Sequence, residues 1–80
     1  MTIQLTILGL GQIGSSVGMS LIKHKESIVR VGHDKSREAV SFAKDNDVVD
    51  RTALTLSGAV KDADIVLLAL PFHEVRSVLE

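Results

Sequence analysis

Three glycines near the start of the chain, Gly9, Gly11 and Gly14, have the spacing G-x-G-x-x-G. Residues without side chains let backbone N–H groups reach an anion, and the first turn of a helix adds unpaired N–H groups and the positive end of the helix dipole. In this pattern the first glycine makes a tight turn, the second lets the backbone approach a pyrophosphate, and the third lets helix and strand pack closely. The candidate phosphate-binding residues are therefore Gly9, Leu10, Gly11, Gln12, Ile13 and Gly14.

An acidic residue lies where a dinucleotide-binding domain needs one, because Asp34 follows Gly14 by twenty positions. Its carboxylate can accept hydrogen bonds from the hydroxyls of the adenosine ribose and would repel a 2'-phosphate, which favours NAD over NADP as cofactor. NADP stays open, since Lys35 and Arg37 lie just beyond and either cation could contact a 2'-phosphate. The plain alternative is that Asp34, Lys35 and Ser36 only cap the next helix.

The elements around the glycines decide how much the motif means, because ordinary turns also contain glycine. Residues 3–8 are β-branched and aliphatic and predict a short buried strand that stops at the first glycine. Beyond the loop, Ile13, Val17 and Leu21 recur every fourth residue and predict the inward face of a helix running to about Lys25. This order of strand, glycine turn and helix favours phosphate binding over a simple turn.

Small residues continue along the predicted first helix. Gly18 falls in its interior, where glycine costs about 1 kcal/mol relative to alanine, so we expect it to permit a close approach of this helix to the sheet. Ser15 and Ser16 either add hydroxyl contacts to a phosphate or serve only as small packing residues.

A second strand and helix follow. Residues 28–31 predict a strand closed by residues 32–34, and Ser36 predicts the N-cap of a helix running to about Lys44. The polar residues 45–47 then end that helix. Its expected inward residues are Ala39, Phe42 and Ala43.

The next segment carries a weaker pattern. We expect a turn at Asp50, a short third strand near residues 52–54 and a brief helix through Val60. Residues 65–70 are apolar at every position, which is typical of a parallel strand covered on both faces, and Pro71 ends this run.

Alternating strands and helices predict an α/β fold, with a parallel sheet of about four strands and flanking helices, as in the front half of a Rossmann domain. Ligands lie at the carboxyl ends of such strands, so Leu70 and Pro71 are expected to line the cofactor site. Residues 72–80 predict a further helix that stops without a cap. We therefore expect residues 1–80 to form an incomplete dinucleotide-binding domain that lacks a substrate domain.

Composition and charge exclude several other classes of protein. The chain is 45% hydrophobic and has nine Lys and Arg against ten Asp and Glu, so it should fold, and no basic stripe points to nucleic acid. Cysteine is absent, no signal peptide is recognisable, and the longest apolar run is six residues, far short of the roughly 20 that span a bilayer. We expect a soluble, cytoplasmic protein.

Neither a metal site nor a catalytic residue can be argued from the sequence. The three histidines, His24, His33 and His73, have no ligand spacing, although His33 adjoins Asp34. The aspartates after the second helix lack the spacing of a calcium loop, and no nucleophile and base can be paired.

The chain resembles the N-terminal Rossmann part of prephenate and arogenate dehydrogenases, the oxidative enzymes of tyrosine biosynthesis. The likeness covers nearly all 80 residues. One departure is Ser15, which stands where glycine is common in that family. The segments that carry the likeness are Ile7-Leu8-Gly9-Leu10-Gly11-Gln12-Ile13-Gly14-Ser15-Ser16, Val31-Gly32-His33-Asp34 and Ala63-Asp64-Ile65-Val66-Leu67-Leu68-Ala69-Leu70-Pro71.

This resemblance implies that Gly9, Gly11, Gly14 and Asp34 bind a nicotinamide cofactor. It also implies an enzyme that transfers hydride from a cyclohexadienyl substrate to the nicotinamide with loss of carbon dioxide. In the family, the catalytic histidine and the substrate-binding arginines lie beyond the segment that this chain matches, partly in a helical dimerisation domain. A homo-oligomer is therefore expected of the complete enzyme.

Two other functions remain open. Another NAD(P)-dependent dehydrogenase or an imine reductase could share the same first half. A non-catalytic nucleotide-sensing module, of the kind that gates potassium transporters, is also built on this loop, although Ala69-Leu70-Pro71 favours the enzyme. If residues 65–70 form an unpaired edge, the chain by itself is expected to self-associate or to bind cofactor weakly.

Overall fold

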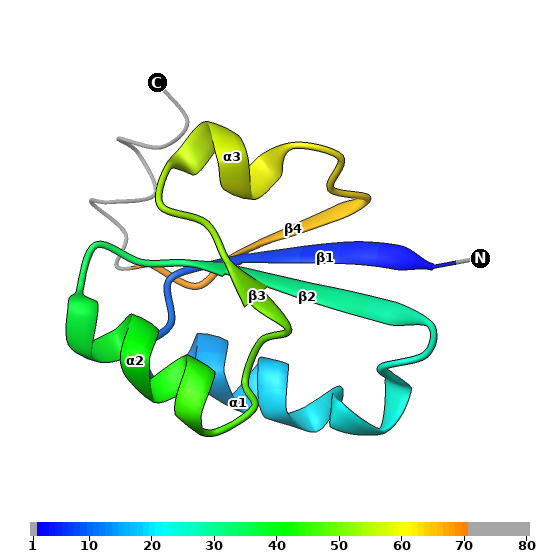
Figure 1. Ribbon diagram of the computed structural model, residues 1–80, viewed down its shortest axis with the longest axis horizontal. Helices are drawn as coiled ribbons and strands as arrows, with labels where there is room; N and C mark the ends of the chain where they lie inside the picture. The colour runs from blue at the N-terminus through cyan, green and yellow to red at the C-terminus, as the bar shows by residue number, and fades with distance from the viewer. Residues whose placement is uncertain (1, 71–80) are drawn as a thin grey trace.

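The computed structural model describes residues 2–70 as a parallel four-stranded sheet with helices on both faces (Figure 1). The predicted α/β class and the number of strands are confirmed. In chain order the elements are β1 (Ile3–Leu8), α1 (Gln12–Ser20), the 3-10 turn η1 (Ile22–His24), β2 (Ile28–His33), α2 (Arg37–Asp45), β3 (Arg51–Thr52), α3 (Leu56–Val60) and β4 (Ile65–Leu68).

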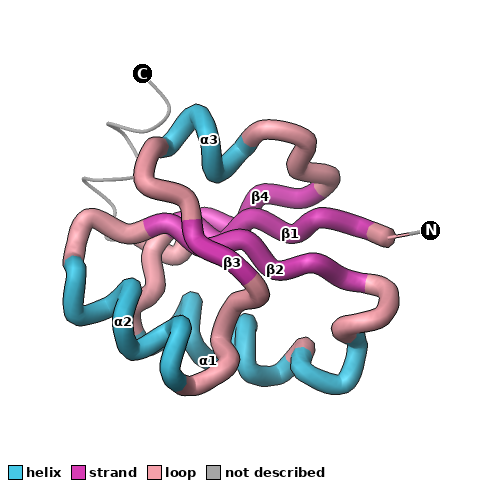
Figure 2. Tube along the Cα trace, in the orientation of Figure 1, coloured by secondary structure: helices cyan, strands magenta, loops and turns pink. Residues whose placement is uncertain are grey.

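The order of strands across the sheet is β3-β2-β1-β4, and every neighbouring pair is parallel. Helices α1 and α2 cover one face and α3 covers the other (Figures 1 and 2). The chain thus moves outward from β1 to β3 and then crosses to the opposite side of β1. This reversal makes the carboxyl ends of β1 and β4 a topological switch point, where open α/β sheets bind their ligands.

Strand β1 lies between β2 and β4, and both of its faces are covered by helices. Leu5 and Ile7 belong to the core under α1 and α2, and Ile7 is fully buried. Toward the other face, the buried Thr6 hydroxyl donates to the carbonyl of Ala59 in α3 at 2.6 Å. A polar side chain is tolerated here because its hydrogen bond replaces the one lost to water.

The first helix presents only part of the face that its apolar periodicity predicts, since Val17 and Leu21 pack against the core as expected. Its buried residues are the small ones, Gly14, Ser15 and Gly18, whereas Ile13 is 71% exposed, so the expectation for Ile13 is wrong. Small residues face the sheet because the helix begins immediately after the turn and lies close to it. The α-helix ends at Ser20, and the 3-10 turn η1 continues the chain to His24, one residue short of the predicted end.

Helix α2 begins as predicted, because the Ser36 hydroxyl accepts a hydrogen bond from the N–H of Ala39 at 3.2 Å. Ala43 is fully buried and Ala39 is partly buried, but Phe42 is 50% exposed, so the expected inward position of Phe42 is wrong. Neighbouring helical positions differ by about 100°, and the two alanines, one turn apart, define the inward direction.

The two short strands differ from expectation in extent and burial. Strand β3 covers Arg51–Thr52 only, and Leu54 is 98% exposed. Strand β4 ends at Leu68 and lies at the edge of the sheet, so Ile65 and Val66 are 54% and 43% exposed. The prediction that this strand is covered on both faces is therefore wrong for its first half. The expectations for Pro71 and for a helix over residues 72–80 lie outside the described residues.

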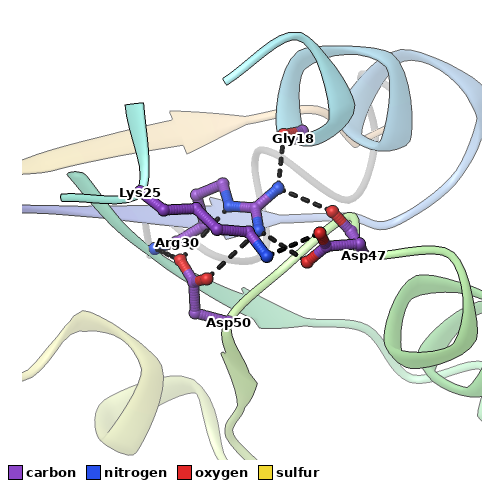
Figure 3. Close-up of polar contacts among 5 residues, drawn as sticks. All are labelled: Gly18, Lys25, Arg30, Asp47 and Asp50. Atoms are coloured by element: carbon purple, nitrogen blue, oxygen red, sulfur yellow. Dashed lines mark hydrogen bonds and ion pairs between the residues drawn. The ribbon is translucent and has the colours of Figure 1, made fainter. Parts of the chain in front are cut away.

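A buried arginine that the sequence analysis overlooked joins α1 to the loop between α2 and β3 (Figure 3). Arg30 is 0% exposed, and its guanidinium donates to Asp50 twice, to the carboxylate and carbonyl of Asp47, and to the carbonyl of Gly18. Lys25 also pairs with Asp47 at 2.6 Å. Each N–H of the Arg30 guanidinium thus donates to an oxygen of the chain itself.

The position of Gly18 is explained by the close approach of α1 to the loop that carries Asp47 and Asp50. A Cβ at Gly18 would collide with the carbonyl oxygen of Val48 and stand 2.6 Å from a methyl of its side chain. The close approach that we predicted is therefore made to the loop before β3, not to a strand of the sheet.

The ion pairs of the cluster shift the pKa values of both carboxylates downward. The pKa of Asp47 is lowered mainly by the hydrogen bond from Lys25, with a further contribution from Arg30. Burial opposes ionisation of Asp50, but the hydrogen bonds and charge of Arg30 outweigh it and lower the pKa of Asp50. Both carboxylates are therefore ionised at neutral pH and hold Arg30 in place.

None of the helices within residues 2–70 has the length and apolar character needed to cross a membrane.

Candidate functional site

The glycine loop connects the carboxyl end of β1 to α1 at the switch point. Gly9 has a φ of +103°, a backbone conformation that side chains disfavour. A Cβ there would also lie 2.5 Å from the carbonyl oxygen of Ala69. The Gly9 N–H donates to the carbonyl of His33 at 2.9 Å, which fixes the turn against the end of β2.

Gly14 allows the helix to begin directly against this turn. A Cβ at Gly14 would collide with the carbonyl oxygen of Gly9 and approach Ile7 Cγ2 to 3.2 Å. The third glycine of the motif therefore has the packing role that its position predicts.

Gly11 differs from the other two glycines of the loop. Apart from its chain neighbours, no atom of residues 2–70 lies within 4 Å of the position that its Cβ would take, so the absence of a side chain relieves no collision there. Gly11 is also the N-cap of α1, and no side chain caps the helix there. A missing side chain that faces open space fits a ligand that must approach the backbone.

The first turn of α1 carries N–H groups that the described part of the chain does not use. The helix ladder starts with the N–H of Ser15, which donates to the carbonyl of Gly11 at 2.9 Å. Between residues 2 and 70, no partner engages the N–H groups of Gln12, Ile13 and Gly14, and the turn contains no acidic side chain. These donors and the helix dipole together favour a bound anion.

Asp34 lies next to the loop rather than only at the end of β2. One carboxylate oxygen accepts the N–H of Leu10 at 2.7 Å, and the other accepts the N–H of Ser36 at 2.8 Å. The bond to Ser36 could have been anticipated, since an aspartate two residues before a helix cap commonly makes this turn. The bond to Leu10, 24 positions away, could not.

The two serines of the first helix turn use their hydroxyls within the chain. Ser15 is buried and donates to the carbonyl of Leu10 at 2.9 Å, which favours the packing role of the two that we considered. Ser16 donates to the carbonyl of Gln12 at 2.8 Å and is exposed.

A cavity of about 600 Å³ opens beside the beginning of α1 and runs between α1 and α2. Neither Asp34 nor Leu70 lines this cavity. It therefore lies beside the carboxyl edge of the sheet and reaches that edge only at the glycine loop. Residues that line it include Gly11, Gln12 and Ser16 on one side and Glu38, Ala39 and Phe42 on the other.

The remaining candidate residues are placed as follows. Lys35 is exposed, immediately after Asp34. Leu70 is partly buried, and its Cδ2 would be 2.8 Å from a Cβ on Gly9, so it adjoins the loop as expected. Pro71 lies outside the described residues. Within residues 2–70, no three metal-ligating side chains gather, and the Nδ1 of His33 pairs with the carbonyl of Ala53 at 2.9 Å.

A parallel sheet that reverses its strand order beside a glycine turn defines the Rossmann class of domain. The sequence model of one family, described as NADP oxidoreductase coenzyme F420-dependent, matches residues 4–80, and the chain belongs to this family.

Two further similarities agree with the family. A prephenate dehydrogenase from Lactococcus lactis subsp. cremoris is 30% identical over 77 residues, which are 96% of this chain and 21% of that protein. The crystal structure of prephenate dehydrogenase from A. aeolicus, in complex with hydroxyphenyl propionate and NAD+, superposes with a TM-score of 0.83 at 24% identity, covering 98% of this chain and 28% of that one. The resemblance stated from the sequence is confirmed, and the chain spans 21% and 28% of the lengths of these two relatives.

Proposed function

We propose that the chain is the nicotinamide-dinucleotide-binding part of a dehydrogenase that acts on prephenate or arogenate. The observation that carries the proposal is the bare first turn of α1, where Gly11 faces open space and three N–H groups are free of partners within residues 2–70. This turn lies at the switch point of a Rossmann sheet. The A. aeolicus relative, which shares the fold, was solved with NAD+.

Two parts of the cofactor, the pyrophosphate and the adenosine ribose, have proposed partners. The N–H groups that begin α1 would bind the pyrophosphate. A carboxylate has about four acceptor positions, and Asp34 uses two of them for Leu10 and Ser36, so two remain for the two hydroxyls of the adenosine ribose. The backbone of Leu70 and Pro71 would line the same edge.

The choice between NAD and NADP depends on the balance of charge at the end of β2. The Asp34 carboxylate disfavours a 2'-phosphate, and the exposed cation of Lys35 beside it partly offsets this repulsion. We propose NAD as the preferred cofactor, although the family description names NADP.

We propose that the catalytic groups for hydride transfer and decarboxylation lie outside residues 1–80. We propose that residues 1–80 act with a substrate-binding part, as a cytoplasmic enzyme of tyrosine biosynthesis that is a homo-oligomer. The exposed Ile65 and Val66 on β4 support association with further protein, because apolar edge strands readily pair.

A second candidate is an oxidoreductase that uses the same dinucleotide site with another substrate. The family description, which names coenzyme F420, favours it. Steady-state assays of the complete enzyme that contains residues 1–80, with prephenate, arogenate and reduced F420, would separate the two candidates.

Substitution of Gly11 by valine tests the site directly. Its φ of −75° suits any residue and a Cβ there meets no other described atom, so the free energy of unfolding should fall by no more than about 1 kcal/mol, the cost of an apolar residue at the N-cap. The added side chain would occupy the pyrophosphate position, and NAD affinity should fall at least about tenfold, as expected when a ligand loses 1.4 kcal/mol. Calorimetric titration and thermal melting measure the two effects.

The matched control is Ser20→Val, which adds a branched side chain at the exposed end of α1 and should leave NAD affinity unchanged. NAD bound equally well by the Gly11 variant would refute the proposed site.

A further inference from the structure

The glycine loop is held at one point by a side chain from a distant part of the sequence. Between Gly9 and Gly11 the backbone N–H of Leu10 donates to Asp34 Oδ2 at 2.7 Å. The other oxygen of the same carboxylate accepts the N–H of Ser36, the N-cap of α2, at 2.8 Å. One side chain therefore bridges the loop after β1 and the beginning of α2.

We propose that Asp34 is a positioning residue for phosphate binding, in addition to its proposed contact with the ribose. The inference rests on the proposed function and deepens it. By fixing the N–H of Leu10, Asp34 keeps the loop in the conformation that exposes the first turn of α1 before any ligand arrives. Hydrogen bonds to a charged acceptor are about twice as strong as neutral ones, which suits this role.

Electrostatics and positioning make opposite predictions for a ligand that has phosphates but no ribose. Asp34 carries a negative charge near the anion site, so removal of that charge should by itself strengthen the binding of inorganic pyrophosphate. If Asp34 positions the loop, its removal should instead weaken pyrophosphate binding. The loop would then lose conformational entropy when the ligand binds, and this cost reduces the free energy of binding. The sign of the change distinguishes the two roles.

The experiment compares Asp34→Ala, Asp34→Asn and Glu38→Gln with the wild-type chain by calorimetric titration with inorganic pyrophosphate and with NAD. Glu38 is an exposed carboxylate in the first turn of α2, and Glu38→Gln removes the same charge nearby while leaving the bond between Asp34 and Leu10 intact. Asparagine at position 34 offers one acceptor oxygen to two N–H donors, so it should keep only part of the clamp.

For Asp34→Ala we expect pyrophosphate affinity to fall about tenfold, consistent with the loss of a charge-assisted hydrogen bond. Asp34→Asn should be intermediate, and Glu38→Gln should bind pyrophosphate as well as the wild type or slightly better. Pyrophosphate affinity in Asp34→Ala that equals or exceeds that of the wild type overturns the proposal, whatever happens to NAD affinity.

Hydrogen exchange of the Leu10 N–H, measured by NMR without ligand, separates this proposal from the proposed function. Its exchange should accelerate at least about tenfold in Asp34→Ala, while the N–H groups of β1 keep their protection. Unchanged exchange overturns the positioning role even in a chain that binds NAD. If the wild type binds neither ligand, the proposed function fails and the exchange of Leu10 alone decides the role of Asp34.

Discussion

Two polar regions of this small domain treat their hydrogen-bonding groups in opposite ways. In the Arg30 cluster, every buried N–H of the guanidinium is paired with an oxygen from the chain. At the glycine loop, the N–H groups that begin α1 have no partner within residues 2–70, and Gly11 borders open space. Unpaired donors are tolerated where water or a ligand can satisfy them, so the cluster stabilises the fold, whereas the loop keeps donors that our proposal assigns to a bound anion.

The difference also explains why glycine appears in both regions for different reasons. Gly18 lets α1 approach Val48, and its own carbonyl accepts from Arg30 at 2.7 Å. A Cβ at Gly11 would contact no other residue in the described part of the chain. A glycine that relieves a collision contributes to packing, whereas a glycine beside open space has no packing role to explain it.

The largest effect that this comparison predicts is a loss of stability when Arg30 is replaced. Arg30→Ala removes the guanidinium from Asp50 and from the carbonyl of Gly18, which keep only backbone N–H donors. Loss of one partner of a buried ion pair costs about 3–5 kcal/mol, and we expect the lower end of this range because Asp50 is partly exposed. A domain of this size has a free energy of unfolding of about 4–12 kcal/mol, so a large share would be lost. Urea unfolding followed by circular dichroism measures the change.

The control for this prediction is Arg51→Ala, because Arg51 is an exposed arginine of β3 whose side chain, among residues 2–70, bonds only to Gln4 Oε1 at 3.3 Å. It should change the free energy of unfolding by no more than about 0.5 kcal/mol. Equal effects at the two arginines would show that the buried cluster does not stabilise the fold.

A smaller effect is expected at Gly14, where packing and ligand binding meet. Gly14→Ala forces a methyl group against the carbonyl of Gly9 and should destabilise the chain by about 1–3 kcal/mol, as overpacking does. The same substitution at Gly11 should cost less, at most about 1 kcal/mol, because it only replaces a glycine N-cap. Thermal melting of the two variants side by side sharpens the distinction between a packing glycine and a ligand-facing glycine, and equal melting temperatures would contradict it.

The smallest expected effect is a change in how stability depends on pH. The pKa values of Asp47 and Asp50 are lowered in the folded chain, so the stability that they contribute is fully present above their unfolded value, about 3.9. It is lost as the pH falls below about 4 toward their folded values. Asp50→Asn should flatten the part of this loss that Asp50 causes, as measured by urea midpoints between pH 2 and 6. An unchanged slope would mean that Asp50 is not held ionised by Arg30.

Local patterns predicted more of the fold than of the site. Strand β1 has the predicted bounds, and Ser36 caps α2 as predicted, because both depend on neighbours in sequence. Burial was predicted less well. Ile13 and Phe42 are exposed because the direction in which a helix faces the sheet depends on the small residues that allow close approach, not on the apolar residues alone.

The buried arginine shows the same limit from the other direction. A lone Arg30 among the apolar residues of β2 was a signal that a buried charge needed partners. Nothing local identified those partners, because Gly18, Asp47 and Asp50 meet Arg30 only after α1 and the loop before β3 have packed against β2.

By itself, the amino-acid sequence determined the order of strands and helices, the glycine turn and the acidic residue after β2, because these follow from backbone conformation and periodicity over short distances. Only the tertiary structure decided that β4 lies beside β1, that every guanidinium N–H of Arg30 finds an acceptor, and that Asp34 accepts a hydrogen bond from Leu10. Each of these joins segments far apart in the chain, and such contacts depend on how whole elements pack rather than on the residues next to them.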